Sequence, residues 1–241
     1  MKDQQLLDTS FGQKTRAEQS ALWEKAFPLG EIDRQTPVWR YLCARGLGDL
    51  VPSRELRFVK RLACWEVPDG QNIDGAAKAR LVGEFPAMLA RLTNAEGKFI
   101  TLHRTYLTAD GSKAPVHSAK KLAAGAVENG VIRLYPAGGV VCLAEGIETA
   151  LSVHALTGLP AWSVVSLSGM KRFGPETIPD GVRTIRICGD NDRSYAGAAG
   201  AYELASRLRR SRPELEVSVH IPQAAGTDWN DVLLAHGMLK L

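Results

Sequence analysis

Two short apolar segments that each end on carboxylates constrain the fold of this chain most strongly. Val140–Ala144 is a run of five apolar residues, and Glu145 follows it at once. Thr184–Cys188 is a second, mostly apolar run, and Asp190 and Asp192 follow it closely. Runs of this kind are typical of strands that are covered on both faces, as in a parallel sheet. The second part of the chain is therefore expected to contain such a sheet.

Predicted strands and helices alternate regularly through this second part. The pattern predicts helices at Ile147–Thr157, Ala196–Arg210 and Asn230–His236, and further strands at Ala161–Ser166 and Glu216–Ile221. Connections this short indicate parallel βα units with right-handed crossovers. The carboxyl ends of all strands should then lie on one edge of an open sheet, which is where such sheets bind ligands.

The carboxylates at this edge suggest a metal site. Glu145, Asp190 and Asp192 would share a small space, and carboxylates held this close repel one another unless cations lie between them. Oxygen ligands of this kind suit Mg²⁺ or Mn²⁺. Asp190 and Asp192 are two residues apart and can reach one cavity, so we predict them to be metal ligands. A carboxylate beside others has a raised pKa, which makes Glu145 a candidate for proton transfer.

These elements resemble the Toprim domain, the metal-binding fold that bacterial-type primases, topoisomerases and some nucleases share. The resemblance rests on Glu145-Gly146 after one strand and on Asp190-x-Asp192 after a later strand. Thr227–Asp231, with the sequence T-D-W-N-D, resembles the third acidic element of the primase branch. The match covers about Gly139–Leu234 and implies an α/β fold with a Rossmann-like parallel sheet flanked by helices. It also implies a catalytic role for Glu145 and a metal-binding role for Asp228.

The first part of the chain is predicted to be a smaller α+β subdomain. Its pattern indicates short helices at Ala21–Phe27 and Pro37–Arg45, a loop at Pro68–Arg80, and a hairpin of strands Phe85–Leu92 and Lys98–Leu107. Pro136–Gly139 forms a turn that we interpret as a boundary. We therefore expect a flexible tail over residues 1–20, a basic α+β subdomain over residues 21–137, and a Toprim catalytic domain over residues 138–241.

Charge is distributed unevenly between these two parts. The net charge is +4, with a positive excess in residues 1–137 and a slight negative excess in residues 138–241. A basic flank beside an acidic metal site suits a polyanionic substrate, although an excess of this size is also usual for a solvated surface.

Several basic residues are candidates for phosphate contacts. The segments R-T-Y-L, K-K-L and I-R-L resemble the basic subdomain that leads into the Toprim domain in primases. The resemblance implies that Arg104, Lys113 and Lys121 contact nucleotide or DNA phosphates. Lys171 and Arg193 lie just beyond two predicted strand ends, and we add them to this set. The backbone amides of Ser168-Gly169, after the strand predicted at Ala161–Ser166, are further candidates for a phosphate contact.

The resemblance implies the catalytic core of a DNA primase. Such a core is a nucleotidyltransferase that condenses nucleoside triphosphates on single-stranded DNA with Mg²⁺ or Mn²⁺. A Toprim nuclease uses similar acids and stays an alternative. A third possibility is a replication accessory protein that binds nucleic acid without turnover.

Cysteine usage and hydropathy bear on location and partners. Cys43, Cys64, Cys142 and Cys188 lack C-x-x-C spacing, so we expect free thiols in a reducing cytoplasm. No apolar run approaches the roughly 18 residues that a membrane span needs, and no secretory signal is recognisable. The chain also lacks the paired cysteines of a zinc ribbon and the G-x-x-x-x-G-K-[ST] motif of a helicase. We therefore expect a zinc-ribbon or replicative helicase partner.

Overall fold

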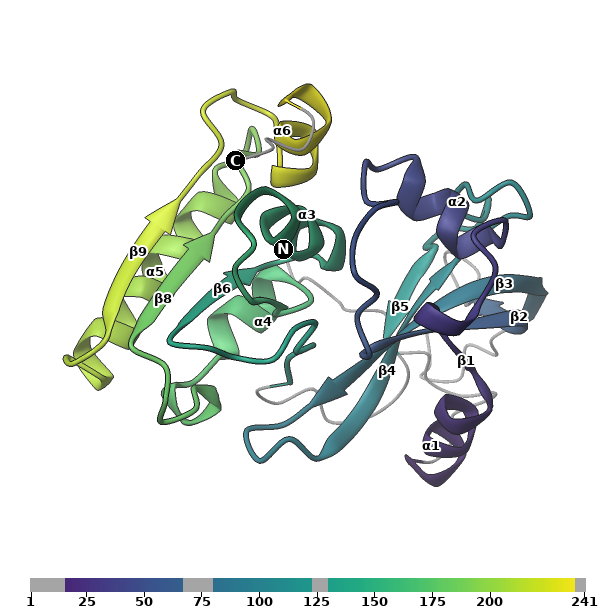
Figure 1. The fold of residues 1–241 in the computed structure, drawn as a ribbon, viewed down its shortest axis with the longest axis horizontal. Helices are drawn as coiled ribbons and strands as arrows, with labels where there is room; N and C mark the ends of the chain where they lie inside the picture. The colour runs from purple at the N-terminus through teal and green to yellow at the C-terminus, as the bar shows by residue number, and fades with distance from the viewer. Residues whose placement is uncertain (1–15, 67–79, 123–129, 237–241) are drawn as a thin grey trace, which may run out of the picture.

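The computed structural model describes residues 16–66, 80–122 and 130–236 of the 241-residue chain. These residues form two sheets that lie beside each other, with helices packed around them (Figure 1). The first sheet has five strands and is antiparallel, and the second has four strands and is parallel. The predicted fold class, a Toprim-like parallel sheet preceded by a smaller α+β part, is confirmed.

The helices and strands have the following bounds. The antiparallel part contains α1 (Arg16–Lys25), β1 (Phe27–Pro28), η1 (Leu29–Glu31), α2 (Pro37–Cys43), β2 (Leu56–Glu66), β3 (Arg80–Thr93), β4 (Phe99–Tyr106) and β5 (Lys120–Leu122). The parallel part contains β6 (Val140–Ala144), α3 (Ile147–Thr157), β7 (Ala161–Ser163), α4 (Leu167–Arg172), η2 (Pro175–Thr177), β8 (Thr184–Cys188), α5 (Ala196–Ser211), β9 (Glu216–His220) and α6 (Trp229–His236).

The predicted hairpin is formed by β3 and β4. The two strands pair antiparallel, and Gly97 lies in the turn between them with a φ of +76°, a left-handed conformation that favours glycine. β3 begins earlier than predicted, because its first half pairs with β2 and starts with Arg80 opposite Glu66. Most of the predicted loop Pro68–Arg80 lies outside the described residues.

The first helix differs from its prediction in position. It covers residues that the sequence assigned to a flexible tail, and Gln19 within it is buried. The Gln19 side-chain oxygen accepts hydrogen bonds from the Thr101 hydroxyl at 2.8 Å and from the Leu102 amide at 3.2 Å. These partners belong to β4, far away in the sequence, so no local pattern predicts the contact. Residues 1–15 of the predicted tail lie outside the described residues.

The parallel sheet has the strand order β7-β6-β8-β9. β7 ends three residues before its predicted end, because Val165 has a φ of +74° and Ser166 caps α4. The Ser166 hydroxyl accepts a hydrogen bond from the Gly169 amide at 3.1 Å. The prediction that the Ser168-Gly169 amides are open to phosphate is therefore wrong for Gly169, whose amide is used inside the protein.

Both faces of the parallel sheet are covered, as the apolar strand runs predicted. On β6, Cys142 and Ala144 belong to the core on the side of α3, whereas Val141 and Leu143 belong to the core under α4 and α5. This alternation follows from the two-residue period of a strand. Ile147 and Leu151 of α3 complete the first of these cores.

That first core continues into the antiparallel part. Tyr41, Leu42 and Leu47 lie in the same buried cluster as Ile147 and Leu151. Figure 1 shows α3 on the side of the parallel sheet that faces the antiparallel sheet. Among the described residues, no helix is long and apolar enough to cross a membrane, and the four cysteines are free thiols.

Candidate active site

Two neighbouring strands bring the predicted acidic residues to one edge of the parallel sheet. β6 and β8 pair in parallel until Ala144 lies opposite Cys188, where both strands end. Glu145 follows one strand directly, and Asp190 follows the other after a single glycine. The strand ends therefore place these two residues next to each other at the carboxyl edge of the sheet. We call this region the acidic edge.

Asp190 is the residue of this edge on which the other carboxylates act. Its Oδ1 is buried and has no hydrogen-bond partner. Burial, together with the negative charges of Glu145, Asp228 and Asp192, raises the pKa of Asp190 to about 7. A carboxylate in this position carries its charge at neutral pH only at a cost, unless a cation compensates it.

The donor set at this edge therefore fits a divalent cation. A buried carboxylate oxygen without a hydrogen-bond donor, within electrostatic reach of three further carboxylates, suits an oxygen-ligated Mg²⁺ or Mn²⁺. Within the described ranges, no set of three Asp, Glu, His or Cys side chains is already gathered to hold a metal ion.

Asp228 reaches this edge because its loop is joined to the segment after β8. The amide of Asn191 donates to the Thr227 carbonyl at 2.9 Å, and the Asn191 side chain donates to the Pro222 carbonyl at 2.8 Å. The Asn191 side chain therefore points away from the acidic edge. Asp228 also caps α6, since its Oδ1 accepts from the amides of Asn230 at 2.7 Å and Asp231 at 2.9 Å.

Asp192 has a different environment from Asp190. Its carboxylate accepts hydrogen bonds from the Ser194 hydroxyl, from the Ser194 amide at 2.9 Å and from the Gly197 amide at 2.7 Å. These bonds lower its pKa, with the Ser194 hydroxyl contributing most. Asp192 therefore serves as the anchor for the start of α5 while its charge still acts on Asp190.

Gly197 is required for this arrangement. A Cβ at this position would lie 2.8 Å from the Asp190 carbonyl and 3.0 Å from Asp192 Oδ2. Gly197 thus leaves room for the protein's own Asp190-x-Asp192 segment.

We expect Gly197→Ala to lower the free energy of unfolding by about 1–3 kcal/mol, because overpacking against backbone displaces both aspartates. Chemical denaturation of the purified variant measures this loss. Gly181→Ala is the matched control, since nothing lies within 4 Å of the position that its added methyl group would take, and the change should be neutral. Equal stability of the two variants would contradict the packing argument.

A buried carboxylate links the acidic edge to the antiparallel part. Glu148 is only 4% exposed. Its Oε2 lies 2.7 Å from Lys120 Nζ, and its Oε1 accepts a hydrogen bond from the Tyr41 hydroxyl. Burial opposes ionisation, but the Lys120 charge and the bonds from Lys120 and Tyr41 hold the pKa of Glu148 well below its usual range.

A second polar contact joins the same two parts. The Asn230 side-chain nitrogen donates to the Arg45 carbonyl at 2.7 Å and to the Ser152 hydroxyl at 3.0 Å. The Arg45 guanidinium donates to Asn230 Oδ1 at 3.2 Å. Lys113 lies nearby and is exposed, and its pKa is lowered by loss of surrounding water and by the Lys120 and Arg45 charges. Basic side chains of the first part therefore face the acidic edge.

Two predicted phosphate contacts lie elsewhere in the antiparallel sheet. Arg104 is buried and donates to the Tyr106 hydroxyl at 3.3 Å and to the Leu122 carbonyl at 3.4 Å. Lys121 Nζ donates to the Trp65 carbonyl at 2.6 Å. Because neighbouring residues of a strand point to opposite faces, Lys120 faces the acidic edge and Lys121 does not.

Lys171 and Arg193 are both exposed in the parallel part. Lys171 lies in the last turn of α4, where a cation favours the helix dipole. Arg193 directly follows Asp192 and precedes α5, so it is adjacent in sequence to the acidic edge.

Sequence reasoning missed Lys120 and Glu148 as members of the site. From sequence alone, an acid in the first turn of a helix is explained by the helix dipole, and a lysine in a loop is explained by solvation. The sequence signal for Glu148 is that it is the only charged residue in the segment I-E-T-A-L-S-V, and the structure shows that Ile147 to Val153 are all buried. An acid in such a helix needs a charged or hydrogen-bonding partner.

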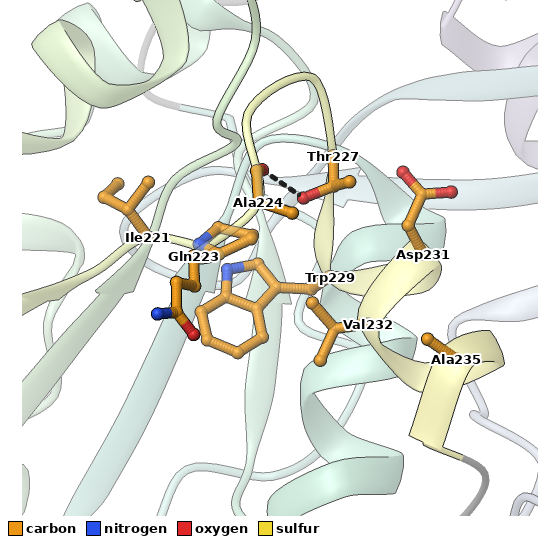
Figure 2. Close-up of a pocket in the computed structure, with 9 residues that line it drawn as sticks. Ile221, Gln223, Ala224, Thr227, Trp229, Asp231, Val232 and Ala235 are labelled. Carbon is orange, nitrogen blue, oxygen red and sulfur yellow. Dashed lines mark hydrogen bonds between the residues drawn. The ribbon is translucent and has the colours of Figure 1, made fainter.

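A pocket of about 450 Å³ lies beside this edge, between the segment after β9 and α6. Its lining consists of Ile221, Pro222, Gln223, Ala224, Thr227, Trp229, Asp231, Val232 and Ala235. Figure 2 shows the Trp229 indole between the side chains of Gln223 and Val232. The indole N–H donates to the Gly189 carbonyl at 3.2 Å, which fixes the ring against the residue before Asp190.

Comparisons with protein families cover nearly the whole chain. Residues 13–134, half of the chain, match a family described as "Domain of unknown function (DUF7146)". Residues 140–238 match a family described as "Toprim domain". No curated protein matches the sequence.

Several solved structures share the fold. A DNA primase domain from Pseudomonas aeruginosa superposes with a TM-score of 0.58 at 14% identity, covering 92% of this chain and 74% of that chain. The E. coli primase catalytic core gives a TM-score of 0.58 at 12% identity, with 92% and 76% covered. A DnaG primase catalytic domain bound to ssDNA gives a TM-score of 0.58 at 12% identity, with 92% and 77% covered. At these identities the likeness concerns the fold.

Proposed function

The chain belongs to the DUF7146 family and carries a Toprim domain in a primase-like fold, and from this premise we propose that it is a DNA primase-type nucleotidyltransferase. In this proposal it condenses nucleoside triphosphates on a single-stranded DNA template with Mg²⁺ or Mn²⁺. The observation that carries the proposal is the acidic edge around Asp190, which basic side chains of the preceding part face.

The acidic residues have separate roles in this proposal. Asp190, Asp192 and Asp228 would hold the cation, and Glu145 is the catalytic residue that accepts the proton of the attacking hydroxyl. A bound divalent cation neutralises phosphate charge and lowers the pKa of a hydroxyl that it contacts. Asp192 already holds the start of α5, so its position is fixed before a cation arrives.

The basic residues would bind the phosphates. Lys113 and Arg193 are exposed near the acidic residues and are proposed as direct contacts from the predicted set, together with Lys120. Arg104 and Lys121 are proposed to support the sheet from inside, where their hydrogen bonds place them. Lys171 is proposed as an outer contact. The zinc-ribbon or helicase partner stays a prediction.

A primer-synthesis assay tests the proposed function. It combines the protein with mixed-sequence single-stranded DNA, labelled nucleoside triphosphates and Mg²⁺ or Mn²⁺. We expect short, metal-dependent products from the wild type and none from Asp190→Ala/Asp192→Ala. Asp180→Ala, which removes an exposed acid of a distant loop, is the matched control and should keep full activity.

The same assay separates the alternatives. Shortened DNA strands in tubes without nucleotides would identify a nuclease. Salt-dependent DNA binding with neither products nor cleavage would indicate a non-catalytic binding protein. Products that persist in the double variant would show that the metal ligands have been assigned wrongly.

A further inference from the structure

Glu148 and Lys120 form an ion pair that crosses between the two parts of the protein. Glu148 belongs to α3 of the parallel part, and Lys120 is the first residue of β5, the edge strand of the antiparallel sheet. Their charged atoms lie 2.7 Å apart. The second oxygen of Glu148 accepts from the hydroxyl of Tyr41, which is itself 3% exposed. Both oxygens of this buried carboxylate are thus bound by groups from the other part.

A second contact, made by Asn230, joins the segment after α2 to α3. Arg45 lies four residues after Tyr41, just past the end of α2, and Ser152 follows Glu148 by one turn of α3. Asn230 of α6 binds both Arg45 and Ser152. One face of α2 and the residues after it therefore meets one face of α3 through two adjacent polar contacts.

Stability alone gives a weak reason for this ion pair. A buried pair gains little over apolar residues of similar size, because both charges lose their hydration. An apolar contact between α2, β5 and α3 would join the parts as well. What the charged pair adds is a fixed position for an ammonium group.

The Lys120 ammonium is fixed in place and is also accessible to solvent. The Lys120 side chain is 37% exposed, so it is held by Glu148 yet remains open to solvent. Glu148 lies in the first turn of α3, three residues after Glu145, near the edge where the strands end. The Lys120 charge also acts on Asp190, where it partly opposes the effect of the neighbouring carboxylates.

We infer that Glu148 is a positioning residue that holds the Lys120 ammonium at the acidic edge, where it meets the phosphates of a nucleoside triphosphate. The inference rests on the proposed function. An ammonium group has three N–H donors, and the bond to Glu148 uses one of them. Lysine binds phosphate as a point charge, so the strength of the contact depends on where the ammonium group lies. Glu148 acts through Lys120 and does not touch the substrate.

A double-mutant cycle on the full chain tests this inference. The affinity for pyrophosphate in the presence of Mg²⁺ is measured by calorimetry for the wild type, Glu148→Gln, Lys120→Gln and the double variant. We expect each single variant to bind about 10-fold more weakly and the double variant to bind about 10-fold more weakly as well, since Glu148 acts only through Lys120. All measurements are made well below the unfolding temperature of each variant.

Tyr41→Phe is the matched control, because it removes the other hydrogen bond of Glu148 and leaves the ion pair. Its affinity should stay within about threefold of the wild type. Lys120→Arg keeps the charge and should retain most of the affinity, which separates loss of charge from loss of fold.

The inference and the proposed function fail in different ways. A double variant about 100-fold weaker than the wild type, the product of two independent losses, would overturn the inference alone. Unchanged affinity in Glu148→Gln would do the same. A wild-type protein that binds no pyrophosphate would overturn both.

Discussion

Replacing Asp190 with asparagine should reduce metal-dependent nucleotide incorporation by about 100-fold or more and should make the metal-free protein more stable. Activity falls because asparagine has no negative charge to hold the cation. Stability rises because the change removes a carboxyl group that is costly to ionise. Burial and the charges of Glu145, Asp228 and Asp192 raise the pKa of this group to about 7. After allowance for partial exposure, we expect a gain of about 1–2 kcal/mol, or about 2–8 °C in Tm.

The dependence on pH follows from the direction of this shift. The pKa of Asp190 is higher in the folded protein than its ordinary value of 3.8. Its favourable contribution is therefore complete below pH 4 and is lost as the pH rises towards 7. In metal-free wild type, stability should fall through this window more steeply than in Asp190→Asn, and Mg²⁺ should restore it. Thermal unfolding between pH 4 and 8, with and without Mg²⁺, measures both effects.

Asp192→Ala provides the contrast. Asp192 holds the start of α5, so its loss should destabilise the protein by about 1 kcal/mol, opposite in sign to the effect at Asp190. If metal-free Asp190→Asn is less stable than the wild type, the charge of Asp190 does not destabilise the folded protein.

Replacing Lys120 with methionine should destabilise the folded protein. It leaves the Glu148 carboxylate buried without its cation, and Tyr41 alone cannot compensate the charge. We expect a loss of about 2 kcal/mol in the free energy of unfolding, less than for a fully buried pair because Lys120 is 37% exposed. Urea denaturation at pH 7 measures it. The double variant Lys120→Met/Glu148→Met should recover most of the loss, because no charge is then left unpaired.

The pH dependence of this loss is opposite to that at Asp190. The pKa of Glu148 is lowered in the folded protein, so its contribution is present above the ordinary value of 4.5 and is lost as the pH falls towards 2. The difference between wild type and Lys120→Met should therefore shrink as the solution is acidified through this range. A difference that stays constant from pH 7 to pH 2 would show that Lys120 contributes by packing alone.

Elements that depend on near neighbours in the chain could be predicted from the sequence. Five apolar residues before Glu145 and a second run before Asp190 predicted two buried parallel strands with their carboxyl ends at one edge, and the structure shows that β6 and β8 are direct neighbours. The hairpin of β3 and β4 also follows from alternation around a glycine turn. Because strand ends in such a sheet share one edge, the sequence could predict that these two carboxylates come together.

Which charged side chains face that edge could not be predicted from the sequence, because it depends on long-range packing. Lys120 and Lys121 are adjacent and chemically alike, and the pairing of β5 with β4 places one at Glu148 and the other at Trp65. Tyr41 and Glu148 are 107 residues apart, so no local pattern relates them. The physical reason is that a strand's register and a buried charge's partner are set by long-range packing, whereas strand and helix formation is set largely by near neighbours.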